Sequence, residues 1–147
     1  MAVEQNKEVV RRQFQLVSDG DAEGAAALYS PSSLNHGKKV DRGSLGMVLK
    51  SVVSLEEKFT VHEMIGEGDW VACRVTVTGR NITQPTVPID GGIHAVAEPT
   101  GKEYTFQHMH LFKVVNGQIV EHWANRDDLG AARQLGLDLK PSTNSTV

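Results

Sequence analysis

The stretch that decides the fold is residues 104–127, which read YTFQHMHLFKVVNGQIVEHWANRD. At its centre, Asn116-Gly117 is the dipeptide most typical of a two-residue hairpin turn, because both of its residues accept positive φ angles. The segments on either side are rich in aromatic and β-branched side chains, as strands are. We therefore predict an antiparallel hairpin with strands over Tyr104–Val115 and Gln118–Asn125.

The turn also predicts which side chains share a face of this hairpin. A two-residue turn pairs Val115 with Gln118, and the pairs further out follow from that register. Paired side chains lie on the same face of the sheet. A one-residue bulge would shift the assignment. One face is expected to carry Phe106, His108, His110, Phe112, Glu121, Trp123, Asn125 and Asp127, and the other Met109, Leu111, Lys113, Val120, His122 and Ala124.

The first of these faces mixes large aromatic rings with imidazole, carboxylate and amide groups. A solvated face would hardly contain two Phe and one Trp, and a plain hydrophobic core would hardly contain so many polar groups. A mostly apolar pocket with a few converging polar groups explains the mixture. We therefore expect this face to line the site of a hydrophobic small molecule.

The rest of the chain reads as helices followed by strands. Apolar residues recur at helical spacing in the first third and later alternate with polar residues. This order favours an α+β fold with segregated layers over alternating βαβ units. The expected helices cover Glu4–Ser18, Ala25–Tyr29, Ser44–Ser54 and Leu129–Leu135, with caps at Asp21 and at Asp127 or Asp128. The other strands cover Phe59–Ile65 and Trp70–Thr78, with a loop over Ser30–Lys39 and a long excursion over Arg80–Pro99 that holds one short strand near Ile93–Ala97.

Composition limits the classes of protein to which the chain can belong. Its 147 residues suit a single domain, with an ordered core over about residues 4–138 and a frayed tail over 140–147. A net charge of −3 with scattered Lys and Arg argues against a nucleic-acid partner. The single cysteine, Cys73, allows no internal disulfide. No apolar run matches a signal peptide or a membrane span, so we expect a cytoplasmic protein with no membrane contact.

Two runs of the sequence resemble a known family. Leu111–Trp123, and Asp127–Gly130 with Gln134-Leu135-Gly136, are similar to the C-terminal part of the SnoaL-like polyketide (ester) cyclases. The resemblance implies a cone-shaped α+β roll, as in nuclear transport factor 2 and ketosteroid isomerase. In this roll, three N-terminal helices pack in a curved antiparallel sheet that encloses one pocket, and a short helix follows at the C-terminus. The implied enzyme, of lyase or isomerase type in secondary metabolism, closes a ring by an intramolecular aldol step without metal or cofactor.

The resemblance also implies catalytic residues. The acid/base carboxylate of the family maps best to Asp127, with Asp128 and Glu121 as rivals. The imidazoles that line the pocket map to His108 and His110. A carboxylate in an apolar pocket becomes a better base near neutral pH, and an imidazole can donate to a developing enolate oxygen. These residue types therefore suit aldol chemistry.

Further residues are expected to bind the substrate. A polar pair at the pocket mouth maps to Asn35 and His36 by the same resemblance. The segment Arg80–Pro99 is longer and richer in Pro and Gly than the corresponding connection of the family, which leaves the identity of the substrate open. The hairpin face supplies the remaining expected contacts, Phe106, Phe112, Glu121, Trp123 and Asn125.

Three other functions remain open. The same fold hosts epoxide hydrolases, dehydratases and isomerases, but a hydrolase needs an Asp–Arg–Asp arrangement, and Arg126 is expected on the face opposite Asp127. His108 and His110 with a later carboxylate could form a facial metal site. A non-catalytic binding module or dimeric scaffold is the third alternative. The second hairpin face is apolar enough to be the interface of a homo-oligomer, a dimer or tetramer, through Met109, Leu111, Val120 and Ala124.

Overall fold

The computed structural model describes residues 2–83, 92–93 and 97–137. The predicted tail over 140–147 lies outside the described residues, and so does most of the predicted strand near Ile93–Ala97. The elements of the described part are, in chain order, α1 (Ala2–Asp19), α2 (Ala22–Ala27), β1 (Tyr29–Asn35), β2 (Lys38–Asp41), α3 (Arg42–Ser54), β3 (Lys58–Glu67), β4 (Trp70–Arg80), β5 (Glu103–Val115), β6 (Gln118–Arg126) and α4 (Asp128–Gln134).

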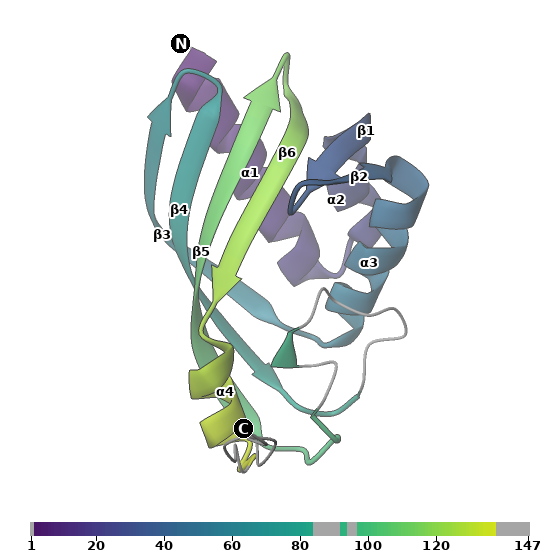
Figure 1. Ribbon diagram of the computed structural model, residues 1–147, viewed down its shortest axis with the longest axis vertical. Coiled ribbons are helices and arrows are strands. Elements are labelled where there is room, and N and C mark those ends of the chain that lie inside the picture. Colours follow the sequence, from purple (N-terminus) through teal and green to yellow (C-terminus); the bar gives the residue numbers. More distant parts are fainter. Residues whose placement is uncertain (1, 84–91, 94–96, 138–147) are drawn as a thin grey trace, which may run out of the picture.

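A six-stranded sheet in the order β2-β1-β6-β5-β4-β3 forms the body of the described residues. Neighbouring strands are antiparallel, except that β1 and β6 run parallel. The sheet is curved, and α1, α2 and α3 pack on one side of it, whereas α4 follows at the far end of β6 (Figure 1). This arrangement confirms the predicted α+β roll, with one parallel strand pair added to the expected antiparallel sheet.

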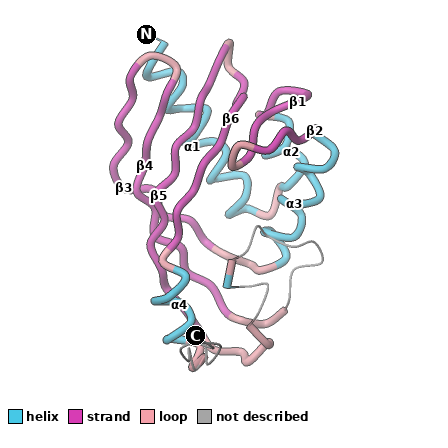
Figure 2. The backbone as a smooth tube through the Cα atoms, in the orientation of Figure 1, coloured by secondary structure: helices cyan, strands magenta, loops and turns pink. Residues whose placement is uncertain are grey.

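Among the described residues, the predicted helices are present, and so are the strands predicted over Phe59–Ile65, Trp70–Thr78, Tyr104–Val115 and Gln118–Asn125, with ends that differ by a few residues. The exception is the segment over Ser30–Lys39, which was expected to be a loop. It forms most of β1 and the start of β2, which pack beside β6 and α3 (Figure 2). The prediction was wrong because a run rich in Ser, with a Pro, carries none of the apolar alternation by which a strand is recognised.

Pairing with β6 rather than local propensity makes β1 a strand. Asn35 lies opposite His122 of β6, and the backbone N–H of His36 donates to the carbonyl oxygen of His122 at 2.9 Å. His36 and Gly37 then have φ angles of 50° and 76°, the left-handed conformation that a tight hairpin turn requires at both central positions. The turn therefore holds Asn35 and His36 against the middle of β6.

The core lies between the helices and the inner face of the sheet. The predicted apolar face of β4 is buried there, and Val10, Phe14 and Val17 of α1 pack against it from the helix side. The residues of the buried β4 face are Val71, Cys73, Val75 and Val77.

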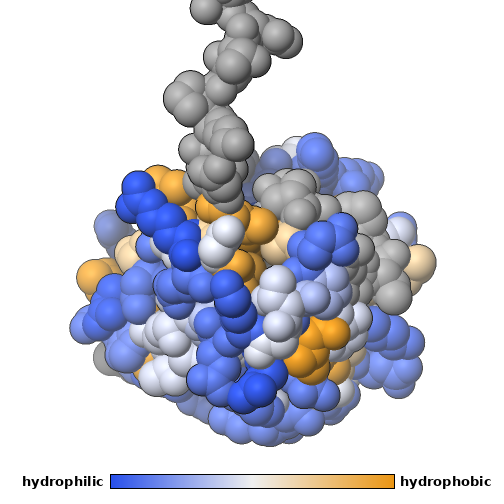
Figure 3. Space-filling model, turned by 90° about the horizontal axis from the view of Figure 1, so that it is seen from below, coloured by the Kyte–Doolittle hydropathy of each residue, from blue (hydrophilic) through white to orange (hydrophobic). Residues whose placement is uncertain are grey.

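The end of the molecule that carries α4 has a mostly hydrophilic surface with a few hydrophobic areas (Figure 3).

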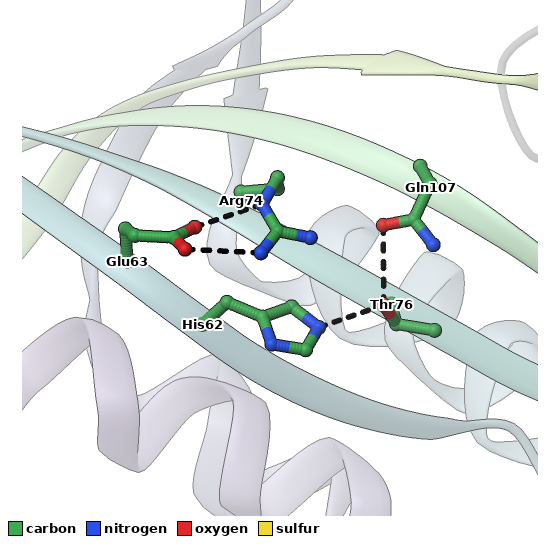
Figure 4. Close-up of polar contacts among 5 residues, drawn as sticks. All are labelled: His62, Glu63, Arg74, Thr76 and Gln107. Carbon is green, nitrogen blue, oxygen red and sulfur yellow. Dashed lines mark hydrogen bonds and ion pairs between the residues drawn. The ribbon is translucent and has the colours of Figure 1, made fainter.

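The outer face of the sheet is held by polar cross-strand contacts (Figure 4). Arg74 on β4 donates to both carboxylate oxygens of Glu63 on β3, at 2.8 and 3.0 Å. Thr76 lies between His62 and Gln107 and hydrogen-bonds to both, at 2.7 and 3.1 Å. These side chains point away from the helices and provide matched surface positions for control substitutions.

Side-chain caps begin three of the helices. Asp21 accepts a hydrogen bond from the backbone N–H of Gly24, as predicted, and Asp41 does the same for Ser44 at the start of α3. Asp127 caps α4, where its Oδ1 accepts from the N–H of Gly130 at 2.9 Å. An N-cap carboxylate satisfies a backbone donor that has no partner inside the helix.

Replacement of this last cap gives a stability prediction. Asp127→Ala removes the acceptor and should lower the free energy of unfolding by about 1 kcal/mol. Asp127→Asn keeps a good N-cap oxygen and should change it by only a few tenths of a kcal/mol. Urea denaturation of both variants measures the difference, and an equal loss in the two would contradict the assignment of Asp127 as a cap.

Candidate active site

A one-residue bulge in β6 corrects the predicted register of the hairpin. Val115 pairs with Gln118 and Val114 with Ile119 as expected, but Lys113 then pairs with Glu121. Val120 is the extra residue, so every pair beyond it is one residue out from the prediction. Because side chains alternate between faces, a shift of one residue turns over the whole segment after the bulge.

The turned segment presents a different set of side chains to the helices. His122, Ala124 and Arg126 point inward, beside the inner-face residues of β5. Glu121, Trp123 and Asn125, which were predicted to bind substrate, lie on the opposite face. Trp123 is 41% exposed, and its Nε1 donates to Glu121 Oε1 at 2.7 Å. These three residues do not line the cavity.

The outer face changes accordingly. Met109 and Leu111 are exposed, as the predicted oligomer interface requires, at 54% and 38%. Ala124, however, has moved inward, and Trp123 has taken a place on the outer face. Homo-oligomerisation through this face stays a prediction.

A cavity of about 270 Å³ lies between the helices and the inner face of the sheet. Its wall is mainly apolar, and polar groups converge on it from β1, β5 and β6. Six residues of the predicted site line it: Asn35, His36, Phe106, His108, His110 and Phe112. Their roles in binding and catalysis stay predictions. The other lining residues include Gln13, Phe14, Leu45, Leu49, Glu57, Phe59, His122, Ala124 and Arg126.

Three imidazoles and an amide form one continuous hydrogen-bonded chain across this wall. Asn35 Oδ1 lies 3.0 Å from His122 Nδ1, and His122 Nε2 lies 3.0 Å from His110 Nδ1. His110 Nε2 lies 3.2 Å from His108 Nδ1. Both ring nitrogens of His110 and His122 are therefore used inside this histidine chain.

The hydrogen bond to Asn35, at one end of the histidine chain, determines which ring nitrogens carry protons. An amide oxygen can only accept, so His122 donates from Nδ1 and accepts at Nε2. The same argument applied to the next two rings places a proton on Nδ1 of both His110 and His108. In the neutral form of His108 the lone pair is then on Nε2. A change at Asn35 would act on all three rings.

Burial keeps two rings of this histidine chain, His110 and His122, uncharged. Burial lowers the pKa of His110 well below its ordinary value of 6.5, and the neighbouring His122, His108 and Arg126 lower it further. For His122, burial first and then His36 and Arg126 lower the pKa to about 3. Both rings are neutral near pH 7, so they orient and accept hydrogen bonds but are weak bases.

Arg126 brings a positive charge to the same wall. It pairs across the sheet with His108, and its side chain is 19% exposed. Its Nε lies 3.7 Å from Asp128 Oδ2. A Cβ atom on Gly92 would come within 2.8 Å of Arg126 Nη2, so the backbone at this position passes too close to the guanidinium for any other residue to fit without a shift. The prediction that Arg126 faces away from the pocket was therefore wrong.

A buried carboxylate lies at the α3 end of the cavity. Glu57 is 5% exposed, and its Oε1 accepts a hydrogen bond from the Tyr104 hydroxyl at 2.8 Å. Burial, followed by the charge of Glu57, raises the pKa of Tyr104, so the phenol stays protonated and donates. Gly79 makes room for the pair, because a Cβ there would lie 2.7 Å from the phenol oxygen.

The carboxylates that the sequence suggested lie elsewhere. Asp127 caps α4, Asp128 stands beside Arg126, and Glu121 points outward. None of the three lines the cavity among the described residues. The bulge explains the difference for Glu121, and for Asp127 the cap fixes the carboxylate against the helix backbone.

His122, Arg126 and Glu57 were not predicted as site residues. For His122 and Arg126 one signal was available: two apolar residues, Ile119 and Val120, stand side by side at the start of the strand, where regular alternation would put one of them on the outer face. Glu57 has no such signal, because its burial depends on how α3 meets β3. Within the described residues, no cluster of three or more His, Cys, Asp or Glu side chains has the arrangement of a metal site. No described helix is long and apolar enough to cross a membrane.

Comparison with known proteins decides the family. The model of the SnoaL-like polyketide cyclase family matches residues 7–135. The chain belongs to this family. The match covers α1 from residue 7 onward, α2, α3, the whole sheet and α4.

Individual relatives agree with this membership. The aklanonic acid methyl ester cyclase DnrD of Streptomyces peucetius is 26% identical over 140 residues, which cover 88% of this chain and 89% of DnrD. The crystal structure of IdmH from Streptomyces antibioticus has a TM-score of 0.71 at 23% identity, over 90% of this chain and 99% of IdmH. SalBIII, an epoxide hydrolase/cyclase-like enzyme of pyran ring formation in the polyether salinomycin, has a TM-score of 0.70 at 18% identity, over 88% of this chain and 97% of SalBIII. The two structures show a shared fold.

The buried, neutral histidines predict a pH-dependent stability. The unfolded chain binds protons on these rings near pH 6.5, whereas folded His122 does so only near pH 3. The contribution of these rings to the free energy of unfolding is therefore fully present above pH 6.5. The free energy of unfolding should fall as the pH drops from about 6.5 toward 4. Each such ring contributes a slope of about 1.4 kcal/mol per pH unit.

The contribution of one ring can be isolated by substitution. In His122→Gln the slope of unfolding free energy against pH should be smaller than in the unsubstituted protein by about one ring's share. The matched control is His62→Gln, since His62 is exposed on the outer face (Figure 4). Urea denaturation between pH 4 and 7 measures the slopes, and an unchanged slope in His122→Gln would contradict the burial argument.

Proposed function

We propose that this protein is a cofactor-independent cyclase that closes a ring in a polyketide-like substrate by an intramolecular aldol step. Membership of the SnoaL-like polyketide cyclases supports the class of enzyme. The observation that carries the proposal is the mainly apolar cavity, on which a hydrogen-bonded histidine chain, Arg126 and one buried carboxylate converge. A surface that only bound a partner protein would not need a cation and a carboxylate that line one small cavity.

The dimensions of the cavity favour a compact substrate. At about 270 Å³ it lies near the lower end of the range that is typical of small-molecule sites. Aromatic rings from both sides of the cavity enclose it, including Phe14, Phe59 and Phe106. Such walls suit a planar aromatic β-dicarbonyl and exclude water from the reacting carbon. They would also hold the flexible part of the substrate in a folded, reactive conformation.

Aldol ring closure needs a stabilised enolate oxygen. Arg126 supplies rigid N–H donors with a permanent positive charge, and it stands beside His108 on the inner face. Preorganised donors at a developing oxyanion contribute on the order of 3 kcal/mol each. We propose that Arg126 donates hydrogen bonds to the enolate oxygen.

The histidine chain would orient the substrate. The lone pair of His108 Nε2 can accept a hydrogen bond from an enol or phenol hydroxyl, groups that polyketide-derived aromatics carry. Because Asn35 and the two following rings fix the tautomer, the acceptor would be in place before the substrate binds. The low pKa of His110 and His122 argues against these rings as the base.

The test is turnover of a graded panel of aromatic β-dicarbonyl compounds, in the presence of a metal chelator. The panel ends with aklanonic acid methyl ester, the compound in the name of the relative DnrD. We expect ring closure of at least one compact member, followed by mass spectrometry and absorbance. Binding without turnover would contradict the cyclase proposal and favour a small-molecule receptor.

Two variants test whether Arg126 stabilises the oxyanion. Arg126→Met should lower kcat by about 10²–10³-fold, because it removes the charged donor. Arg74→Met is the matched control, since Arg74 pairs with Glu63 on the outer face (Figure 4). Equal activity of Arg126→Met and Arg74→Met would contradict the assignment.

A further inference from the structure

We propose that Glu57 is the acid/base residue of this site, taking the proton from the substrate carbon and returning it to the new hydroxyl. This inference rests on the proposed cyclase function and names a residue that the family resemblance does not provide. Among the described residues, Glu57 is the one carboxylate that lines the cavity. Asp127, the residue suggested by the resemblance, is engaged as the cap of α4.

The turn between α3 and β3 directs the Glu57 side chain into the cavity. After α3, whose C-cap is Leu55, Glu56 takes a φ angle of 55°, a left-handed conformation that is uncommon for a non-glycine residue. The chain thus turns sharply before β3 begins at Lys58. The next side chain, that of Glu57, is 5% exposed and reaches the cavity. Strained backbone of this kind is found where a side chain must be placed accurately.

Tyr104 and Gly79 hold the carboxylate in one position. The phenol donates to Glu57 Oε1 at 2.8 Å, and burial keeps that phenol protonated. A Cβ on residue 79 would lie 2.7 Å from Tyr104 Oη and 3.1 Å from Glu57 Cγ, so only glycine leaves both in place.

The reaction balances without any further reactant. The Glu57 carboxylate removes a proton from a carbon between two carbonyls, and the electron pair of the broken C–H bond forms the enolate. That enolate carbon attacks a second carbonyl carbon of the same molecule, a C–C bond forms, and the C=O π pair becomes an alkoxide. The alkoxide then takes the proton back from the Glu57 carboxylic acid. The product is an isomer of the substrate, and nothing is oxidised or reduced.

Hydrogen–deuterium exchange tests the proton transfer directly. In D₂O, wild-type protein should exchange the proton between the two carbonyls of the panel compound that it cyclises. Glu57→Gln keeps an oxygen that accepts from Tyr104 but cannot take a proton. We expect exchange and kcat to fall by about 10²–10⁴-fold, with the dissociation constant and melting temperature close to wild type.

Control and rescue variants separate chemistry from folding. Glu63→Gln makes the same substitution on the outer face and should retain wild-type exchange (Figure 4). Glu57→Asp restores a carboxylate and should recover part of the exchange that Glu57→Gln lost. If Glu57→Gln does not fold, comparison of Glu57→Asp with wild type decides the question, because loss of all exchange in a folded Glu57→Asp protein overturns the inference.

The outcomes distinguish this inference from the proposed function. Turnover by wild type, with exchange retained in Glu57→Gln, overturns the role of Glu57 and leaves the cyclase standing. The same follows if Asp127→Asn, rather than Glu57→Gln, abolishes exchange. If wild type neither cyclises nor exchanges any panel compound, the proposed function fails and the inference fails with it.

Discussion

The bulge at Val120 is the constraint on which the site depends. It turns the second half of β6 over, so that His122, Ala124 and Arg126 join the inner face of β5 and Trp123 leaves it. Without the bulge, the inner wall would carry a carboxylate, an indole and an amide in place of an imidazole, a methyl group and a guanidinium. The cavity would then have a different charge and a different shape. One inserted residue therefore sets the chemistry of the site.

The polar side chains that line the cavity are of two kinds, uncharged hydrogen-bonding groups and charged groups. At the β1 side, burial keeps His110 and His122 neutral, and hydrogen bonds join them to Asn35 and His108, so these two rings orient and accept hydrogen bonds without supplying charge. The charged lining residues among those described are Lys38, Arg126 and Glu57, and Arg126 pairs with His108 across the sheet. A cation at the oxygen and a carboxylate at the carbon are what enolate chemistry requires. The apolar rings that line the same cavity would reduce the access of water, which would compete with the substrate for both charged groups.

The sequence predicted the fold more completely than the site, for physical reasons. Periodicity identified α1, α3 and the strands β3 to β6 because each has one apolar face. It missed β1 and β2, whose pairing with β6 is a tertiary effect. It placed the β5 residues of the cavity correctly, since β5 alternates without interruption, but it misplaced those of β6 beyond the bulge. Glu57 could not be predicted, because its burial comes from the turn between α3 and β3.

Cross-strand nuclear Overhauser effects between β5 and β6 test the central claim, the register that the bulge imposes. The account predicts contacts that link Phe112 with His122 and His110 with Ala124, and a contact between Val114 and Ile119 on the turn side of the bulge. Contacts that link Phe112 with Glu121 and His110 with Trp123 would show a regular hairpin. That result would return His122 and Arg126 to the outer face and contradict the site described above.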